Sequence, residues 1–442
     1  MALALIAGAA AVDITPDSSQ FLFGYPHVRR YSTGVHDPLL SSALFLSDGA
    51  TPLLWVANDV IFIGRETATR VRRRIEEQTG VPAANIMVTA THTHSGPITA
   101  DMLSNESDEA IPPADPRYIE QLENGIVTAA VRAHGSARPA EIGLATANGS
   151  GIGTNRHDPA GPSDPQVPVL ALRDAETKTF LAVMLVCSMH PTVLHEDSTL
   201  ISGDFVAMAR RWLQRHVLGE NCPVLCHTGP CGDQSPRHVA KANTFKEAER
   251  LGGILGQAVA KAIATIGYTT EITLGCWRAT VELPVRRQPS VDEAQKGLDR
   301  ARERLETLRR SGANAAQVRT AECDWFGAEE TRNLAGAAAA GRLDRVVASV
   351  MPAEVTLARI GPWALVGWPG EVFVEFALML KARHPNCFVV SLANGELQGY
   401  LATEQAMREN WYEAMNSLFS SPEAGMLLVG KTLELLDAAG MA

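Results

Sequence analysis

The chain alternates short apolar runs with longer segments of helical periodicity. Apolar runs of three to seven residues predict buried strands, and apolar positions spaced three and four apart predict amphipathic helices. This alternation favours a layered α/β fold, in which mixed sheets are flanked by helices. The predicted strands are 44–46, 53–56, 86–90, 167–172, 180–186, 224–227 and 365–367, and the predicted helices are 64–78, 116–134, 204–218 and 245–266.

One stretch, 290–349, departs from this pattern. It is rich in Ala, Arg and Glu, and its charges recur at helical intervals. A solvated helical insertion explains this better than an arm that binds nucleic acid, and the insertion is also in a position to form a cap. The strand pattern resumes at 353–360. We therefore expect a single large domain over residues 1–442, with a helical insertion at about 290–349.

The N-terminal run 2–12 is apolar and reads either as a short secretion signal or as a buried first strand. No basic residue precedes it, and it passes directly into the sequence Asp13-Ile14-Thr15-Pro16. The strand is the preferred interpretation, so we expect a cytoplasmic protein. No apolar run reaches the roughly 20 residues of a membrane span, and no integral membrane segment is expected.

Composition narrows the class of protein. Of 442 residues, 46% are hydrophobic and 20% charged, which is typical of an ordinary globular chain. The net charge of −10 is spread without a basic stripe, so nucleic acid is not an expected partner. Seven scattered cysteines predict reduced thiols rather than a disulfide scaffold. The sequence does not define the oligomeric state, and a homo-oligomer is one of the possible partners.

Several common catalytic motifs are missing from the sequence. There is no phosphate-binding loop, no G-x-S-x-G nucleophile elbow and no dinucleotide-binding glycine pattern. The pair His195-Glu196 begins like a zinc-protease motif, but Thr199 stands where the second histidine is needed. These absences leave other hydrolytic or binding chemistries.

Histidines follow two of the predicted strands. His92 and His94 come directly after strand 86–90, and residues two apart in extended chain share a face. His190 follows strand 180–186, and Pro191 favours extended backbone there. Neutral imidazoles buried at strand ends are good zinc ligands. Taken singly, a hydrogen-bonded loop pair explains His92 and His94, and a structural role explains His190, better than metal binding does.

Other polar residues occupy later loops. Glu371 follows strand 365–367 and a Pro-Gly turn near the start of a helix, where it either complements the helix dipole or acts as an anionic ligand. Ser235 lies in a Gly- and Pro-rich loop. It is a candidate for a nucleophile, a hydrogen-bond donor or simply a turn residue. Arg156, Tyr400 and Tyr412 also lie in polar loops, where solvation or packing accounts for each alone.

Together these segments resemble one family, the neutral (non-lysosomal) ceramidases and their bacterial relatives. The resemblance extends from the first strand to Tyr412 and corresponds to the family's catalytic domain. Its motifs occur in the family's order and are AGAAAVDITP at 7–16, GVHDP at 34–38, THTHSGP at 91–97, GTNR at 153–156, MHPT at 189–192, SGDF at 202–205, GDQSP at 232–236, PGE at 369–371 and the segment between Tyr400 and Tyr412.

The resemblance implies a zinc-dependent amidohydrolase with one catalytic ion and a metal-activated water. It implies that the ion is held by four residues, which are His92, His190, Glu371 and Tyr400. It places four further residues around the reacting amide, which are His94, Arg156, Ser235 and Tyr412. Of these, Ser235 would act either as a nucleophile or as a hydrogen-bond donor. Asp204, Asp233 and His36 are candidates for orienting the ligands.

The substrate class is less closely defined than the chemistry. The sequence has no convincing export signal, lipid anchor or basic interfacial helix, and GDQSPRH replaces the more usual GDVSPN around Ser235. We therefore expect an N-acyl amide, either lipid-like or a smaller and more soluble molecule, and favour the latter over ceramide. Two alternatives remain: a zinc esterase or lactonase using the same site, and a non-catalytic relative that binds a metal or ligand.

Overall fold

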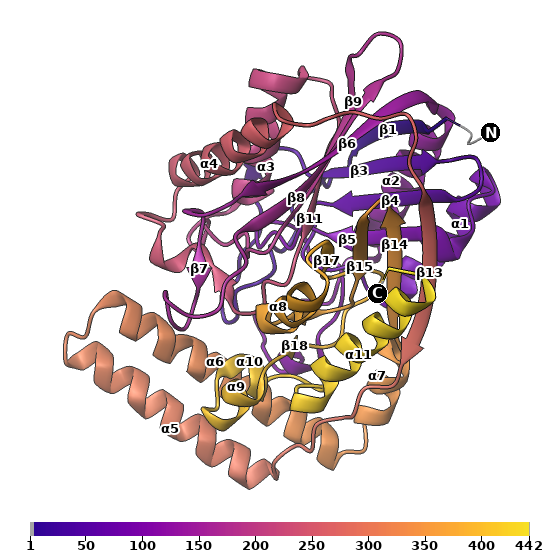
Figure 1. Ribbon diagram of the computed structural model, residues 1–442. Helices are drawn as coiled ribbons and strands as arrows, with labels where there is room; N and C mark the ends of the chain where they lie inside the picture. Colours follow the sequence, from indigo (N-terminus) through magenta and orange to yellow (C-terminus); the bar gives the residue numbers. More distant parts are fainter. Residues whose placement is uncertain (1–3, 442) are drawn as a thin grey trace.

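The computed structural model describes residues 4–441, without the side chains of residues 315 and 316. Two sheets stack face to face, and helices cover the outer face of each (Figure 1). The interior between them is one apolar cluster, to which both sheets contribute side chains such as Trp55, Met184, Leu365 and Phe388. Apolar residues on both faces of the strands produce this layered arrangement. The expected α/β fold with mixed, helix-flanked sheets is confirmed.

The larger sheet has eight strands and mixed directions. The neighbours β4 and β5 run parallel, as do β9 and β11, and the other pairs of this sheet are antiparallel. The parallel pairs matter most for function, because the segments that follow their carboxyl ends carry polar side chains. In spatial order the strands are β11 (Val224–Thr228), β9 (Phe180–Cys187), β8 (Gln166–Asp174), β6 (Arg138–Asn148), β1 (Ile6–Asp13), β3 (Leu40–Ser47), β4 (Pro52–Asn58) and β5 (Ile86–Ala90).

The second sheet has four strands, with β15 and β17 parallel. In spatial order they are β13 (Leu274–Val281), β14 (Ala353–Ile360), β15 (Trp363–Gly367) and β17 (Cys387–Val390). Three two-stranded ribbons complete the strands: β2 (Gly34–Val35) with β10 (Leu200–Ile201), β7 (Thr154–Asn155) with β12 (Gln234–Ser235), and β16 (Glu371–Val372) with β18 (Tyr400–Leu401).

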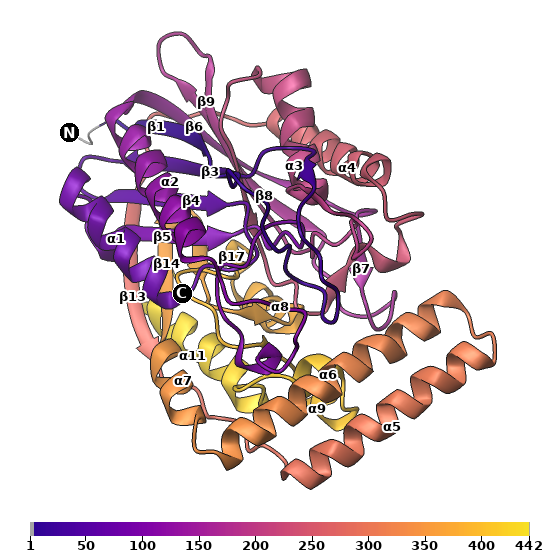
Figure 2. The same cartoon turned by 180° about the vertical axis from the view of Figure 1, so that it is seen from behind.

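Helices cover the outer faces of both sheets (Figures 1 and 2). Over the larger sheet lie α1 (Arg65–Thr79), α2 (Pro116–Gly135), α3 (Asp204–Leu213), which ends in a π-helical turn at Gln214–Leu218, and α4 (Phe245–Ile263). The smaller sheet is covered by α8 (Val374–Arg383) and α11 (Pro422–Ala438). Two short helices, α9 (Glu404–Arg408) and α10 (Tyr412–Met415), precede α11.

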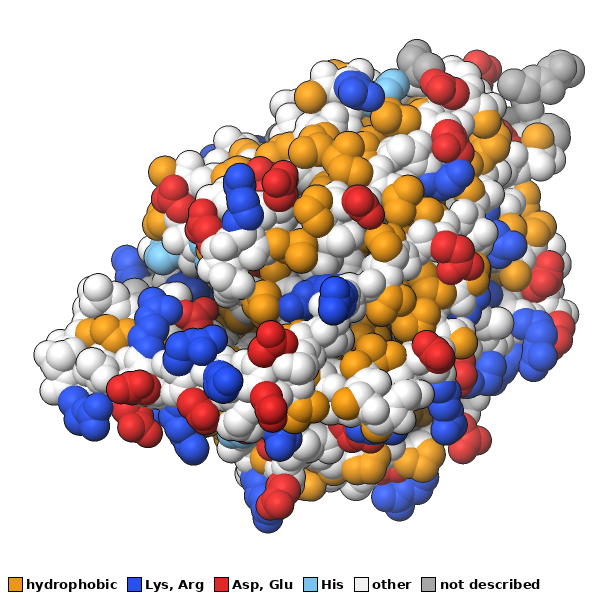
Figure 3. All heavy atoms as spheres, turned by 90° about the horizontal axis from the view of Figure 1, so that it is seen from below, with side chains coloured by type: hydrophobic (Ala, Val, Ile, Leu, Met, Phe, Trp, Pro, Cys, Tyr) orange, Lys and Arg blue, Asp and Glu red, His pale blue; other side chains and the backbone are white. Residues whose placement is uncertain are grey.

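The segment expected to be a helical insertion forms α5 (Val291–Arg310), α6 (Ala315–Ala339) and α7 (Leu343–Val350). Helix α5 buries only Ala294 and Leu305, and it pairs with α6 as an antiparallel hairpin that projects from the sandwich (Figure 2). Positive and negative side chains mix over this lower face of the molecule (Figure 3). The outer helix is therefore a solvated one, whereas α6 packs on α10 and on the turn Leu103–Asn105.

The first strand is present at Ile6–Asp13 and overlaps the run 2–12 that the sequence assigned to a buried strand, although only Ala7 and Gly8 are buried; residues 2 and 3 of that run lie outside the described residues. Within residues 4–441, no helix combines the length and apolar character that a membrane crossing needs. The strands and helices predicted from periodicity occur within a few residues of their expected bounds.

Candidate metal centre and active site

The polar segments that follow separate strands converge on one pocket. His92 follows β5, His190 follows β9, and the loop carrying Ser235 follows β11. His92 has a left-handed backbone (φ 68°), so the chain turns sharply after the strand rather than continuing extended as the sequence suggested. Even so, His92 and His94 converge, with their Nε2 atoms 3.4 Å apart.

Each of these histidines is oriented by a backbone carbonyl. The Nδ1 atom of His92 lies 3.0 Å from the oxygen of Ile61, and that of His94 lies 3.1 Å from the oxygen of Gly24. The Nδ1 atom of His190 lies 2.6 Å from the oxygen of Cys231. A carbonyl oxygen only accepts, so Nδ1 must carry the proton in all three rings. Each Nε2 then presents a lone pair.

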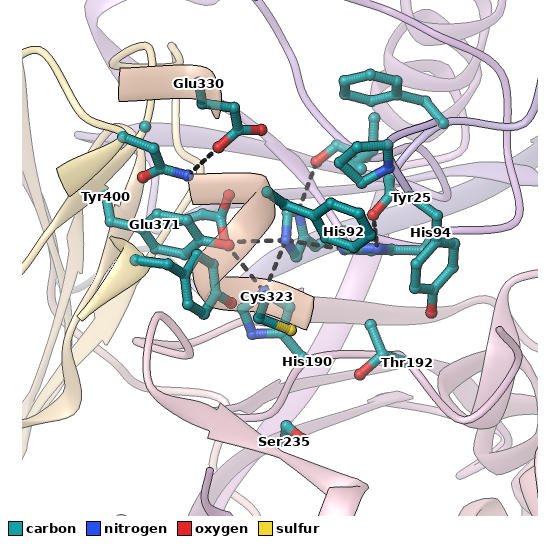
Figure 4. A pocket seen from close by; sticks show the side chains of 18 of the residues that line it. Tyr25, His92, His94, His190, Thr192, Ser235, Cys323, Glu330, Glu371 and Tyr400 are labelled. Atoms are coloured by element: carbon teal, nitrogen blue, oxygen red, sulfur yellow. Dashed lines mark hydrogen bonds and ion pairs between the residues drawn. The ribbon is translucent and has the colours of Figure 1, made fainter. Parts of the chain in front are cut away.

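The three Nε2 lone pairs point into one small space (Figure 4). The Nε2 atoms of His92 and His190 are 3.1 Å apart, and the Oε2 atom of Glu371 lies 3.1 and 3.0 Å from them. This carboxylate oxygen is buried and receives no hydrogen bond from the described residues, despite its closeness to both rings. Four acceptors facing one another without a donor would repel, unless a cation lies between them. The donor set therefore fits a metal ion.

Burial keeps the imidazoles of His94 and His190 neutral, as metal ligation requires. Burial lowers the pKa of His190 to about 4, although Glu371 acts in the opposite direction. Burial, reinforced by the two neighbouring imidazoles, lowers the pKa of His94 well below the ordinary histidine value. The rings of His94 and His190 therefore supply lone pairs at neutral pH.

Glu371 lies in a strand rather than in a helix. It pairs with Tyr400 across the parallel ribbon β16–β18, and α8 begins three residues later at Val374. Dipole complementation in the first turn of a helix, one of the two sequence-based interpretations of Glu371, is therefore wrong. The ribbon also explains how Tyr400, far away in sequence, comes to line the same pocket.

Arg156 reaches the pocket through the ribbon β7–β12, in which Ser235 pairs with Thr154. Its guanidinium is buried and its Nε atom donates to Glu413 at 2.8 Å. It also lies 5.4 and 5.1 Å from the ring centres of Tyr400 and Tyr412. Burial raises the pKa of both tyrosines well above the ordinary value, so each presents a neutral hydroxyl.

Ser235 lines the pocket and begins the 3₁₀ turn Pro236–His238. Its Oγ accepts a hydrogen bond from the backbone N–H of Arg237 at 3.0 Å. Among the described residues, no histidine or carboxylate is hydrogen-bonded to this hydroxyl. The hydroxyl proton is therefore free to be donated.

The residues expected to orient the ligands act elsewhere. Asp233 accepts from the side chain of Asn155 at 2.8 Å, and Asp204 accepts from the backbone of Val193 at 3.0 Å, so both fix loops near the site. His36 stacks on Phe245, with ring centres 3.8 Å apart, and does not line the pocket. The expectation that these three residues orient the histidine rings is therefore wrong, because backbone carbonyls hold the Nδ1 atoms instead.

Two features of the site escaped the sequence-based interpretation. The first is Glu413, which is fully buried, does not itself line the pocket and pairs with Arg156; its Oε1 atom also lies 2.8 Å from Nε2 of His157. Its only sequence signal is its place next to Tyr412. The second is a stripe along α6, at positions spaced as one face of a helix, namely Arg319, Cys323, Phe326 and Glu330.

Comparisons with known proteins agree with this arrangement. The family model described as "Neutral/alkaline non-lysosomal ceramidase, N-terminal" matches residues 5–244. The chain is 26% identical over 230 residues to neutral ceramidase B of Dictyostelium discoideum, covering 48% of this chain and 32% of that protein. It is 26% identical over 262 residues to neutral ceramidase of Mycobacterium tuberculosis, covering 52% and 40%. The matched parts thus span well under half of these relatives.

The fold itself is shared with solved structures. The neutral ceramidase of Pseudomonas aeruginosa superimposes with a TM-score of 0.74 at 18% identity, covering 99% of this chain and 75% of that one. A structure described as ceramidase complexed with C2 gives a TM-score of 0.74 at 16% identity, covering 99% and 76%.

Fold and site together define an α/β protein with a buried histidine and carboxylate centre at its strand ends. The chain belongs to the neutral/alkaline non-lysosomal ceramidase family. The family resemblance drawn from the motifs is thereby confirmed.

Proposed function

We propose that the protein is a zinc-dependent hydrolase that cleaves an amide bond. The observation that carries the proposal is the convergence of four electron-pair donors whose orientation leaves no proton between them. His92, His190 and Glu371 would hold the ion, with Tyr400 beside them on the paired strand. When bound, zinc lowers the pKa of a coordinated water and polarises a carbonyl oxygen.

The surrounding side chains suit the other needs of amide hydrolysis. The Arg156 guanidinium and the neutral Tyr412 hydroxyl are donors for the oxygen that gains negative charge. Glu413 holds the guanidinium in place, so little reorganisation is needed when the charge develops. This preorganisation in a buried site favours the transition state over the ground state.

His94 suits proton transfer to the leaving nitrogen. Its Nδ1 is bound to the Gly24 carbonyl, so its Nε2 can take up a proton and return it to the departing amine. Ser235 is assigned the role of hydrogen-bond donor, because a serine nucleophile needs a base and none contacts its hydroxyl among the described residues.

Metal analysis of variants tests the ligand assignment. His92→Ala and Glu371→Gln are each expected to lose stoichiometric zinc, whereas His94→Ala retains zinc and loses kcat. Arg215→Gln, which removes an exposed arginine outside the pocket, serves as the control and keeps both. If both His92→Ala and Glu371→Gln keep one zinc per chain, the ligand assignment is wrong.

A panel of N-acyl amides tests the reaction. The zinc-loaded protein is expected to release free amine, to lose this activity on chelation, and to recover it on addition of zinc. If it hydrolyses no amide while retaining zinc, amide hydrolysis is refuted and the metal site stands alone.

A further inference from the structure

The pocket has two chemically different ends. One end, which we call the apolar lobe, belongs to the same packed cluster as the core beneath it. Within this lobe, Phe62 contacts the metal centre, with its ring centre 6.4 Å from that of Phe23 and 5.3 Å from that of His92. The apolar lobe consists of Phe23, Ile61, Phe62, Met102 and Ile111.

A second set of lining residues, the polar lobe, carries cationic and hydrogen-bonding side chains. Tyr25 separates it from the histidine group, because its ring contacts both His94 and His195, with centres 5.4 and 5.7 Å apart. The N-terminal half of α6 forms one wall through Arg319 and Cys323. The polar lobe consists of Thr192, His195, Arg237, Asn243 and Arg319.

Arg237 differs from the other two arginines of the pocket. Arg156 is paired with Glu413, and Arg319 is paired with Glu196 and Glu322 at 3.0 and 2.7 Å. Arg237 is half-buried, and the one hydrogen bond of its guanidinium among the described residues goes to the Cys323 sulfur, at 3.7 Å. Within residues 4–441 it forms no ion pair. Of the three arginines that line this pocket, Arg237 is thus the one that no carboxylate of the described residues neutralises.

A half-buried guanidinium of this kind favours an anionic ligand. Its planar fork matches a carboxylate, and charge-assisted hydrogen bonds are about twice as strong as neutral ones. A neutral substrate arm would displace water from Arg237 without replacing its hydrogen bonds, which carries a desolvation cost. Arg237 and Ser235 belong to one turn and line the same pocket, so a group bound by Arg237 lies in the pocket that holds the metal centre.

We propose that Arg237 binds the carboxylate of an N-acyl amino acid, whose acyl chain occupies the apolar lobe. The amide then spans the metal centre, between the two lobes. This inference rests on the proposed amide hydrolysis and adds the substrate class. It also gives a physical role to the replacement of GDVSPN by GDQSPRH, since the arginine lies in the altered part of that motif.

Two substrates with the same acyl chain test the inference. N-lauroylglycine carries the carboxylate and N-lauroylethanolamine carries a neutral hydroxyl in its place. The wild type is expected to show a higher kcat/KM for the glycine conjugate. Arg237→Gln is expected to lower the ratio of the two kcat/KM values by about 10- to 100-fold, the range for a hydrogen bond to a charged group. The control Arg215→Gln leaves the ratio unchanged.

A third amide places the anion on the other arm. N-dodecylsuccinamate has its carboxylate on the acyl side, and a preference for it that depends on Arg237 would overturn the assignment of the two arms. If Arg237→Gln leaves every ratio unchanged while amides are hydrolysed, the carboxylate subsite is refuted and the hydrolase stands.

Binding without turnover separates the subsite from the reaction. N-dodecylsulfonylglycine has no amide carbonyl to cleave, and its affinity is measured by titration calorimetry. Its Kd is expected to rise about 10- to 100-fold in Arg237→Gln. If this shift is found but no amide is cleaved, the subsite stands and the proposed function falls. If the Kd is unchanged, the subsite is refuted, whatever the activity.

Discussion

The contact between α6 and Tyr412 yields the sharpest prediction. Gly327 lies on the face of α6 that packs against α10, and a methyl group there would come within 2.5 Å of Cβ and 3.0 Å of Cα of Tyr412. Carbon atoms in contact prefer about 3.5–4.0 Å, so Gly327→Ala must move the helix by about 1 Å. Backbone atoms are among those struck, and a side-chain rotation alone cannot relieve the clash.

The expected cost follows from overpacking. Gly327→Ala should lower the free energy of unfolding by about 1–3 kcal/mol, even though alanine is the better helix former. Because α6 lines the pocket beside Tyr412, a shift of about 1 Å should also reduce kcat/KM for an amide by up to about 100-fold.

The same helix provides a matched control. A methyl group at Gly336 meets no atom within 4 Å, so Gly336→Ala should stabilise the protein by about 0.5–1 kcal/mol and leave kcat/KM unchanged. Thermal and urea unfolding of the two variants, each with amide kinetics, provide the comparison. If Gly327→Ala matches Gly336→Ala in stability and activity, α6 does not pack on Tyr412 as described.

Two further predictions concern buried charges. Burial raises the pKa of Glu330 to about 7, although the side chains of Asn416 and Asn105 donate hydrogen bonds to it. The pKa in the folded protein therefore exceeds the unfolded value near 4.5. The free energy of unfolding should fall by up to about 3 kcal/mol as the pH rises from 4.5 through 7. Glu330→Gln should remove this slope in melting temperatures measured at pH 5 and pH 8; an unchanged slope would contradict the assignment. Glu413→Gln should lower the free energy of unfolding by about 3–5 kcal/mol in urea, because the charge of Arg156 stays buried and loses its partner. The control Glu404→Gln changes an exposed side chain and should cost little. Equal effects of the two substitutions would refute the buried pair.

The sequence was most informative about local structure and about residue types. Strand 86–90 was predicted with its observed bounds, and the histidines that follow it were recognised as candidates for a metal site. The reason is that periodicity reports burial, and imidazoles next to a buried strand need a partner. The same local signals left each histidine with a structural alternative, because neither spacing nor composition says what lies opposite.

Long-range pairings were beyond those signals. Glu413 neutralises Arg156 across 257 positions, and Arg237 lacks such a partner, yet both arginines simply look like polar loop residues in the sequence. Helix α6 was expected as a helix with solvated charges, and only its packing on α10 shows that one face lines the pocket. Helix periodicity identifies a face but not what that face meets.

The sequence by itself therefore determined the elements, the family and the supply of ligand atoms. Tertiary structure decided which atoms of those residues are available. The carbonyls of Ile61, Gly24 and Cys231 hold the protons on Nδ1 and turn three Nε2 lone pairs toward one another, two of them within 3.1 Å of Glu371. Every residue carries the same carbonyl group, so its position appears only once the backbone has folded.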